Sequence, residues 1–467
     1  CMRDAFALII PVLRAILSRG DVMLESIWAQ SAAMPEFESL KHDIKTDVLI
    51  IGGGIAGLLC AYLLKEEGVD YALVEADRIC RGVTRNTTAK ITAQHGLLYD
   101  KLIRRFGKER AKMYLTLNLD ALARYRALSG EIDCDFEEQD SFVFSLYDRR
   151  KLEREANALH ALGFDATLEE SLPLPFAVEG AVRFPGQARF HPLKFLSAIA
   201  RGLNIYERTP VVELGESGGR PTAKTERAMI RAERMILATH FPILNKHGGY
   251  YLKMYQSRAY VLALEHAPDL RGMYVDEADG GLSFRNYENL LLLGGCGART
   301  GKKSGAWQEL SRLAGRFYPR ARPVAQWATQ DCMTLDGAPY VGRYSPGTPA
   351  LYVITGFNKW GMTSAMAGAM LLRDRMLGRE NPLAPAFDPQ RSIWRPQLAV
   401  NAAEAAVNLL TPSVKRCPHL GCALKWNRNE QTWDCPCHGS RFTREGALLD
   451  NPATGGLKGA QEPPRGE

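Results

Sequence analysis

The hydrophobic pattern near the start of the chain predicts an α/β unit. Four consecutive apolar residues, 48–51, are typical of a buried strand, and apolar side chains then recur at helical spacing from Ile55 to Glu67. Gly68 follows at a position where helices commonly end. A second apolar run, residues 71–74, predicts the next strand.

Further along the chain, helical and extended patterns alternate before an antiparallel block. Helices are predicted at 99–128, 149–162 and 192–201, and strands at 142–144, 181–184, 187–190, 204–212, 234–239 and 351–355. Residues 250–293 instead alternate apolar and polar positions, with many aromatic residues and with Gly and Asp at turns, which predicts an antiparallel sheet.

The first predicted strand runs directly into the motif G-x-G-x-x-G, formed by Gly52, Gly54 and Gly57, and the second ends at Glu75. These glycines allow a tight turn, a close approach of backbone to a pyrophosphate, and close packing of helix on strand. The helix N-terminus offers free N–H groups to the anion, and Glu75 can accept hydrogen bonds from a ribose hydroxyl. The motif therefore predicts a dinucleotide-binding site.

Two other stretches are candidates for the same ligand. Thr87 and Thr88 lie in a loop whose hydroxyl groups could donate to phosphate oxygens, although a solvated loop has the same composition. A second glycine-flanked helix begins near Gly361, after the strand at 351–355. Its N-terminal dipole would stabilise the negative charge of a reduced flavin, and an ordinary tight turn is the alternative.

Length and charge narrow the class of protein. The chain has 467 residues, enough for two or three domains, and a net charge of +7 without a dense Lys/Arg tract, so a nucleic-acid partner is not expected. The apolar stretch 6–17 is too short to span a bilayer, and Met23 is a plausible start. We therefore expect a cytoplasmic protein without a transmembrane segment, whose scattered cysteines suit a reducing compartment.

The C-terminal region holds the most specific motif of the chain. Cys417-Pro-His419 and Cys435-Pro-Cys437-His438 offer two thiolates and two imidazoles from two loops. This matches the Rieske pattern, in which two histidines replace two cysteines on one iron of a [2Fe–2S] cluster. A Cys₂His₂ zinc site is the alternative, but zinc fingers usually pair Cys with Cys and His with His.

From Asp47 to about Leu377 the chain resembles the FAD-dependent oxidoreductases of the D-amino acid oxidase, glycine oxidase and sarcosine oxidase group. The resemblance implies that the glycine motif and Glu75 bind the ADP half of FAD. It also implies a backbone contact from Val211 to the adenine, and that Gly361, Met362 and Thr363 lie at the flavin ring. No second G-x-G-x-x-G follows a strand, which favours reduction of the flavin by an organic substrate directly.

From Cys417 to about Gly456 the chain resembles respiratory Rieske domains. The resemblance implies Cys417 and Cys435 on one iron, His419 and His438 on the other, and a Cys422–Cys437 disulfide. It also implies a hydrogen bond from Ser440 to a cluster sulfide, while Phe442 stands where high-potential members carry Tyr. Little chain separates the helical stretch 402–410 from Cys417, so the sheet of this domain is expected to be incomplete.

The expected fold is a Rossmann-like, glutathione-reductase-type FAD-binding domain with an interleaved α+β antiparallel-sheet substrate domain and a small all-β Rieske domain. The expected parts are an N-terminal extension (1–44), FAD-binding segments (45–98, 185–240 and 328–380 within 45–395), substrate-domain segments (99–184 and 241–327), a linker helix (396–411) and a shortened Rieske domain (412–467).

These features predict an enzyme that oxidises a small amine or amino acid at FAD and passes electrons through the cluster to an external protein or quinone. A non-enzymatic electron-transfer or redox-sensing protein, and a zinc-stapled NAD-dependent dehydrogenase, are the alternatives. Arg258 and Arg299 are candidates for binding a substrate carboxylate. Tyr255, His191 and His240 are further pocket candidates, although each residue type more often packs in a protein interior.

Overall fold

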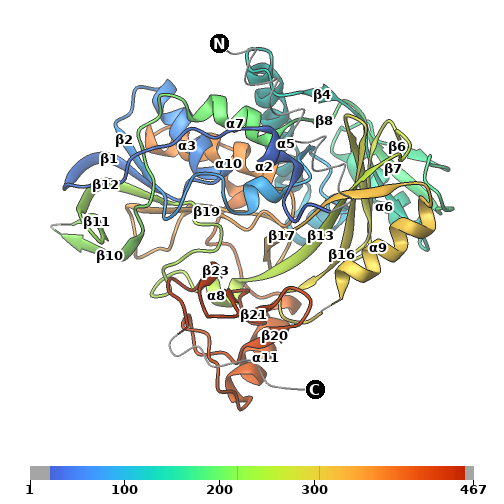
Figure 1. Cartoon of the computed structure of the whole chain (residues 1–467). Helices are drawn as coiled ribbons and strands as arrows, with labels where there is room; N and C mark the ends of the chain where they lie inside the picture. Colours follow the sequence, from blue (N-terminus) through green and yellow to red (C-terminus); the bar gives the residue numbers. More distant parts are fainter. Residues whose placement is uncertain (1–21, 218, 304, 458–467) are drawn as a thin grey trace, which may run out of the picture.

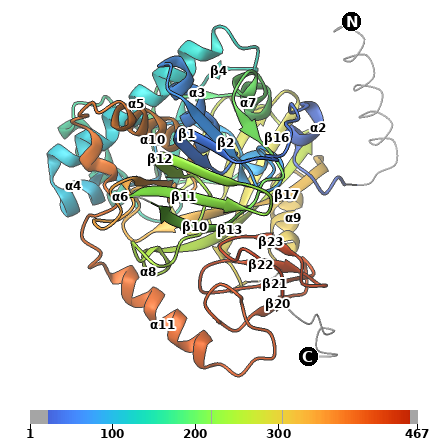
Figure 2. The ribbon, with the colours of Figure 1, turned by 90° about the vertical axis from the view of Figure 1, so that its left-hand side faces the viewer.

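The structure of the protein is a computed structural model, which describes residues 22–217, 219–303 and 305–457. In Figure 1 a first eight-stranded sheet lies on the left, a second eight-stranded sheet (the mixed sheet) lies on the right, and a small C-terminal domain lies below both. Figure 2 shows the same C-terminal domain beneath the body, with helix α11 extending along one side. Among the described residues, no helix is long and apolar enough to cross a membrane.

The first sheet is built around β1 (Ile44–Ile51), which pairs in parallel with both of its neighbours. Its strands in order are β10 (Val211–Ser217), β11 (Arg220–Thr225), β12 (Met229–Leu237), β1, β2 (Tyr71–Val74) and β9 (Ile205–Tyr206), with β19 (Leu351–Thr355) beside β12 and β18 (Tyr340–Arg343) beside β19. Ile50 packs into the core that contains helices α3 (Ile55–Glu66), α7 (Pro192–Ala200) and α10 (Gly361–Met376). Leu49 packs into a second core on the opposite face. The run of apolar residues is therefore buried on both sides, as parallel strands require.

The mixed sheet carries the antiparallel block and adds strands from earlier in the chain. In order they are β17 (Arg322–Thr334), β13 (Met254–Glu265), β16 (Leu290–Arg299), β15 (Ser283–Tyr287), β14 (Met273–Asp276), β5 (Ser141–Ser145), β7 (Gly180–Phe184) and β6 (Thr167–Glu169). Only the β14–β5 pair in this sheet is parallel. Helix α9 (Ala306–Phe317) contributes Leu310 and Ala314 to the core on one face.

The remaining elements connect and cover these sheets. They are α2 (Ile27–Ser31), η1 (Val83–Asn86), α4 (Tyr99–Phe106), α5 (Lys108–Ser129), α6 (Arg149–Ala161), α8 (Tyr250–Lys253), η2 (Ala384–Phe387) and a small sheet of β3 (Lys90–Ile91), β8 (Ala188–Arg189) and β4 (Glu137–Glu138). Trp28 of α2 is fully buried and donates from Nε1 to the carbonyl oxygen of Thr87 at 2.7 Å. The segment before β1 is thus partly packed, while the apolar stretch 6–17 lies outside the described residues.

Three sequence predictions are corrected by the backbone. The helix predicted at 99–128 is two helices, because Gly107 adopts φ +84° between α4 and α5. The strand predicted at 204–212 is divided into β9 and β10, because Arg208 adopts φ +48° and Pro210 follows it. Residues 328–334, expected in the FAD-binding part, lie in β17 and pair with β13 of the mixed sheet.

The C-terminal domain consists of helix α11 (Pro396–Leu410) and a four-stranded antiparallel sheet. The strands are β20 (Lys425–Asn427), β21 (Thr432–Asp434), β22 (Arg441–Thr443) and β23 (Leu448–Asp450). Within the described part of this domain, every strand follows the loop that begins at Cys417, with only a bridge between Arg416 and Ala423 inside that region. The sheet of this domain is accordingly short. The domain contacts the rest of the chain, which is called the body below, through the mixed sheet.

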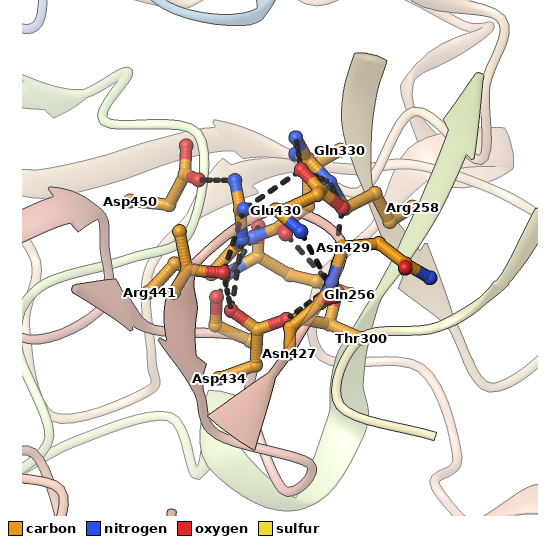
Figure 3. A network of polar contacts seen from close by, with 12 residues as sticks. Gln256, Arg258, Thr300, Gln330, Asn427, Asn429, Glu430, Asp434, Arg441 and Asp450 are labelled. Atoms are coloured by element: carbon orange, nitrogen blue, oxygen red, sulfur yellow. Dashed lines mark hydrogen bonds and ion pairs between the residues drawn. The ribbon is translucent and has the colours of Figure 1, made fainter. Parts of the chain in front are cut away.

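The contact with the body depends on a buried ion pair (Figure 3). Arg258 of β13 donates from Nε to Glu430 of the C-terminal domain at 2.8 Å, and Tyr260 Oη donates to the same carboxylate at 2.7 Å. Arg441 binds Glu430 from within the domain at 2.9 Å. Burial would raise the pKa of Glu430, but the charges of Arg258 and Arg441 outweigh this effect and lower the pKa to about 2.

Two glutamine side chains of the mixed sheet hold backbone carbonyl groups of the same domain. Gln256 Nε2 donates to the carbonyl oxygens of His438 at 2.8 Å and Asn451 at 2.7 Å. Gln330 Nε2 donates to the carbonyl oxygen of Gly439 at 2.8 Å. These carbonyl groups are therefore paired although they are removed from water, which avoids a cost of about 1–3 kcal/mol for each.

The close packing of α3 on β1 can be tested by substitution. A Cβ atom at Gly57 would lie 1.9 Å from the carbonyl oxygen of Gly52, so Gly57→Ala must displace the helix. We expect a loss of about 1–3 kcal/mol in the free energy of unfolding, measured by thermal denaturation. Gly315→Ala is the control, because nothing lies within 4 Å of the added methyl group. Equal stability of the two variants would contradict the prediction.

The ion pair at Glu430 can be tested by removing its partner from the body. Arg258→Leu leaves a buried carboxylate facing an apolar side chain, which costs about 3 kcal/mol. We expect limited proteolysis to release the C-terminal domain at least about tenfold faster. Arg149→Leu is the matched control, because the Arg149–Glu153 pair is exposed on both sides. Release at the wild-type rate would show that the pair does not hold the domain.

Candidate functional site

A cavity of about 1080 Å³ lies where the first sheet, the mixed sheet and the C-terminal domain meet. Most of the predicted cofactor contacts line it: Gly52, Gly54, Glu75, Thr87, Thr88, Val211, Gly361 and Met362. Residues 448–451 and 453–454 of the C-terminal domain line the same cavity. The sequence predicted these segments separately from their motifs, and the structure places them around one cavity.

The glycine-rich turn forms one wall of the cavity and leaves no space for larger residues. Gly52 adopts φ +112°, and a Cβ atom there would lie 2.5 Å from the carbonyl oxygen of Ala238. Glu75 Oε2 accepts a hydrogen bond from the backbone N–H of Gly53 at 2.6 Å. Burial raises the pKa of Glu75, and the hydrogen bonds from Asp77 and Gly53 oppose this. The turn, the start of α3 and this carboxylate fit the ADP half of a dinucleotide.

Two of the predicted contacts lie behind the cavity wall. Gly57 serves the packing of α3 on β1, as its distance to Gly52 shows. Thr363 is buried and donates from Oγ1 to the carbonyl oxygen of Thr92 at 2.9 Å, with His95 Nε2 at 3.0 Å. The hydroxyl group of Thr363 is therefore used within the protein, and the position of this residue at the flavin ring stays a prediction.

His95 lines the cavity and is a residue that the sequence did not indicate. Its ring stacks on Trp360, with 5.2 Å between the ring centroids, and its Nδ1 lies 2.6 Å from the hydroxyl of Tyr114. Burial lowers the pKa of His95 to about 3, so the ring is neutral at physiological pH. A neutral, stacked histidine beside the start of α10 adds a flat wall without adding charge.

The loop after Glu75 carries a cation that its composition did not single out. Lys90 lines the cavity and donates from Nζ to Thr88 Oγ1 at 3.2 Å. Burial and the nearby charge of Arg285 lower the pKa of Lys90 to about 7. Thr87 Oγ1 accepts from the N–H of Ala89 at 2.9 Å. The predicted phosphate contacts from Thr87 and Thr88 thus lie beside the amine of Lys90, whose protonated form suits an anionic ligand.

The segment before α10 has an unusual backbone. Asn358 and Lys359 adopt φ +52° and +74°, and Asn358 Oδ1 accepts a hydrogen bond from the N–H of Thr334 at 2.8 Å. Left-handed backbone in residues other than glycine costs free energy and concentrates at functional sites. The conformation places Lys359 in the cavity wall, where its Nζ would lie 3.4 Å from a Cβ atom added at Gly297.

Asp331 of β17 lines the cavity near this lysine. Burial raises the pKa of Asp331 to about 6, and the charge of Lys359 partly opposes the shift. A carboxylate from β17 and an ammonium group from the turn before α10 therefore face one cavity. Sequence reasoning missed both residues, since neither belongs to a spaced motif and their proximity arises only from the fold.

The two arginines predicted to bind a substrate carboxylate are corrected by the structure. Arg258 is paired with Glu430, and Arg299 donates to the carbonyl oxygens of Pro436 at 2.8 Å and Cys437 at 2.7 Å. Neither arginine lines the cavity. Both occupy the junction between the mixed sheet and the C-terminal domain, where carbonyl and carboxylate groups of the chain satisfy their guanidinium donors.

The three further pocket candidates, Tyr255, His191 and His240, lie in different parts of the structure. Tyr255 lies beneath Arg299, with 4.7 Å between the guanidinium carbon and the ring centroid. His191 caps α7 by accepting a hydrogen bond from the N–H of Lys194 at 3.1 Å. His240 lines the cavity and adopts φ +64°. Only His240 is therefore placed where a pocket group could act.

The predicted metal ligands lie in two loops of the C-terminal domain. The Nδ1 atoms of His419 and His438 are buried and have no hydrogen-bond partner among the described residues. Their Nε2 atoms lie 2.9 Å from Asn245 Oδ1 and 2.9 Å from the carbonyl oxygen of Tyr251. Burial lowers the pKa of His419 to about 3 and of His438 to about 4. Both rings are neutral, with Nδ1 lone pairs available to a metal.

The sulfur atoms gather at the same place. Cys417 and Cys435 are hydrogen-bonded through their side chains, and the Sγ atoms of Cys422, Cys435 and Cys437 lie within 4.8 Å of one another. Two free imidazole nitrogens beside buried thiols fit a [2Fe–2S] cluster of the Rieske type. Cys422 and Cys437 are free thiols in the structure, so the disulfide between them stays a prediction. Ser440 is fully buried, and its bond to a cluster sulfide stays a prediction as well.

The segment from Thr239 to Phe241 connects the cavity to this cluster site. Thr239 and His240 line the cavity, and the ring of Phe241 lies edge-on to His419 and His438, with centroids 6.2 Å and 6.1 Å away. Asn451 fixes the segment by donating from Nδ2 to the carbonyl oxygen of Phe241 at 3.1 Å. Three consecutive residues thus span the distance between the two sites.

Comparison with known proteins agrees with this geometry. Residues 47–375 match the model of the FAD dependent oxidoreductase family, and residues 398–461 match that of the Rieske [2Fe-2S] domain. YhfW of Bacillus subtilis, whose name describes a Rieske 2Fe-2S iron-sulfur protein, is 34% identical over 93% of this chain and 97% of its own length. An iron-sulfur subunit of the Synechocystis cytochrome b6-f complex is 49% identical over 10% of this chain and 25% of its own.

Solved structures share the fold of the body. Glycine oxidase from Geobacillus kaustophilus superposes with a TM-score of 0.64 at 21% identity, over 74% of this chain and 99% of that one. L-amino acid deaminase from Proteus vulgaris gives 0.62 at 18% identity, over 77% and 97%. FAD and a [2Fe–2S] cluster are the cofactors that these two domains imply, which replaces the zinc-stapled NAD-dependent dehydrogenase alternative. The chain belongs to the FAD dependent oxidoreductase family and carries a C-terminal Rieske [2Fe-2S] domain.

Proposed function

We propose that the protein oxidises a small amino acid at its CH–NH bond and passes the electrons through the Rieske cluster to an external protein or quinone. The observation that carries the proposal is the shared cavity, which is lined by the FAD-binding turn, the mixed sheet and residues 448–451 of the Rieske domain. FAD bound there would accept a hydride from the substrate carbon and release its electrons singly.

The charges in the cavity support an amino acid as the substrate class. Lys359, in the turn before α10, and Asp331, in β17, both line the cavity wall. Each can pair with one charged group of a zwitterion. In this arrangement Lys359 holds the substrate carboxylate and Asp331 receives the ammonium group. Asp331 is ionised above pH about 6, so it can also take the proton that the amine must lose before it gives up a hydride.

A redox sensor or a simple electron-transfer module would also hold FAD in this cavity. The feature that favours a substrate is the pair of opposite charges, Asp331 and Lys359, in the cavity wall. The cysteines of the body, among them Cys60 and Cys332, are free and buried. Free thiols favour a reducing compartment, so we place the reaction in the cytoplasm.

The proposed electron route can be tested with the purified holoprotein. Under anaerobic conditions, we expect one of a panel of amino acids and amines to bleach the flavin and then to produce the EPR signal of a reduced Rieske cluster. The control is Cys435→Ser, which removes a predicted cluster ligand and should keep flavin bleaching while losing the EPR signal. Absence of bleaching with every compound, or bleaching without cluster reduction in the wild type, would refute the route.

The roles of Lys359 and Asp331 can be distinguished by comparing an amino acid with an amine that lacks a carboxylate. We expect Lys359→Met to raise the half-saturating concentration of the amino acid about tenfold or more, with little effect on an amine that lacks a carboxylate. Asp331→Asn should weaken both compounds, and it should remove the loss of rate that protonation of the carboxyl causes below pH about 6. The measurement is the rate of flavin bleaching. Equal effects of Lys359→Met on both compounds would exclude a carboxylate contact.

A further inference from the structure

The outer edges of both cluster histidines face the oxidoreductase body. His419 Nε2 is 2.9 Å from Asn245 Oδ1, and His438 Nε2 is 2.9 Å from the carbonyl oxygen of Tyr251. Both partners are acceptors, so each imidazole is protonated at Nε2 and keeps Nδ1 for iron. The two rings lie 4.9 Å apart between centroids, with Phe241 against both. The edge that carries these nitrogens is therefore covered by the body.

The loop that carries His438 is held at several points. Its carbonyl groups accept hydrogen bonds from Gln256, Gln330 and Arg299, all of which belong to the mixed sheet. At Gly439, a Cβ atom would lie 2.5 Å from the Cβ of Gln256, so the backbone of this loop is in close contact with the Gln256 side chain. Moving this domain would break all of these hydrogen bonds at once.

We propose that the Rieske domain is a fixed relay that takes electrons through its histidine edge, and that Asn245 is the positioning residue that sets the potential of the cluster through His419. This inference rests on the proposed electron route. A cluster held by these cysteines and histidines would accept one electron at a time, so the two electrons from the substrate would pass singly to the external one-electron acceptor.

Asn245 acts on the cluster through the electron density of the imidazole. A hydrogen bond accepted from Nε2–H makes the ring a better donor to iron, which stabilises the oxidised cluster and lowers its potential. Tyr251 provides the same interaction from its backbone, so it holds His438 whatever its side chain. Asn245 is therefore the member of the pair that substitution can change.

The effect of Asn245 can be measured on the full-length holoprotein by an EPR-monitored redox titration. We expect Asn245→Leu to raise the midpoint potential of the cluster and Asn245→Asp to lower it, because a carboxylate is the stronger acceptor. His247→Leu, at an exposed position of the same loop, is the matched control and should leave the potential unchanged. If Asn245→Leu loses iron, Asn245→Asp carries the test. Unchanged potentials, or shifts of both variants in one direction, would overturn the role of Asn245.

The fixed position of the domain can be tested with a reversible cross-link. Gln308 of α9 and Asn429 of the Rieske domain are exposed and 3.4 Å apart at their side chains. Gln308→Cys with Asn429→Cys should be joined by a short thiol-reactive cross-linker with a cleavable spacer, because the two thiols lie further apart than the longer native side-chain tips; Gln308→Cys alone is the control. After photoreduction of the flavin, we expect the cluster of the cross-linked protein to be reduced within about twofold of the control rate.

The two proposals fail in different ways. Photoreduction needs no substrate, so a panel of amino acids that leaves the flavin oxidised would refute the proposed function without touching this test. A cross-link that slows cluster reduction about tenfold or more would show that the domain must move, and would overturn the fixed relay. Photoreduced flavin that leaves the cluster oxidised in the control protein would overturn entry through the histidine edge.

Discussion

The carboxylate of Glu430 is the constraint on which the placement of the cluster depends. It is nearly buried, and it is shared between Arg258 of the body and Arg441 of its own domain. A buried carboxylate is costly unless its charge is compensated and its oxygens are hydrogen-bonded. Because one of its two arginines lies in each domain, full compensation is reached only when the domains are together. The docking of the Rieske domain is therefore part of the folding of the whole chain.

The cavity is likewise formed by elements of more than one domain. The helices α3 and α10 both begin at its wall, and the strands β1, β2 and β19 all end there. Parallel strands bring their carboxyl ends to one edge of a sheet, where helix N-termini favour an anionic ligand. The mixed sheet closes the opposite side with Asp331, and the Rieske domain closes the remainder with residues 448–451. The FAD-binding turn, the mixed sheet and the C-terminal domain thus contribute walls to one cavity.

Sequence reasoning identified what local motifs encode. The turn at Gly52, the helix start at Gly361 and the histidines of the cluster loops were predicted because the chemistry requires fixed spacing along the chain. Asp331, Lys359 and Asn245 were missed because their neighbours come from distant segments.

Arg258 and Arg299 show the converse limit of sequence reasoning. Their residue type suits both a substrate carboxylate and a domain junction, and only the tertiary structure assigns them to the junction. The backbone breaks at Gly107 and Arg208 were missed for a related reason, since hydrophobic periodicity continues across a single left-handed residue.

The shortness of the C-terminal sheet has a consequence for the history of such proteins. All four of its strands follow the first cluster loop within the described residues, and the loop that carries His438 is held by side chains of β13 and β17 of the body. A metal-binding domain whose loops are held by a neighbouring domain depends on that neighbour for its structure. The two domains are therefore expected to evolve together, with substitutions on one side of the shared surface matched by substitutions on the other.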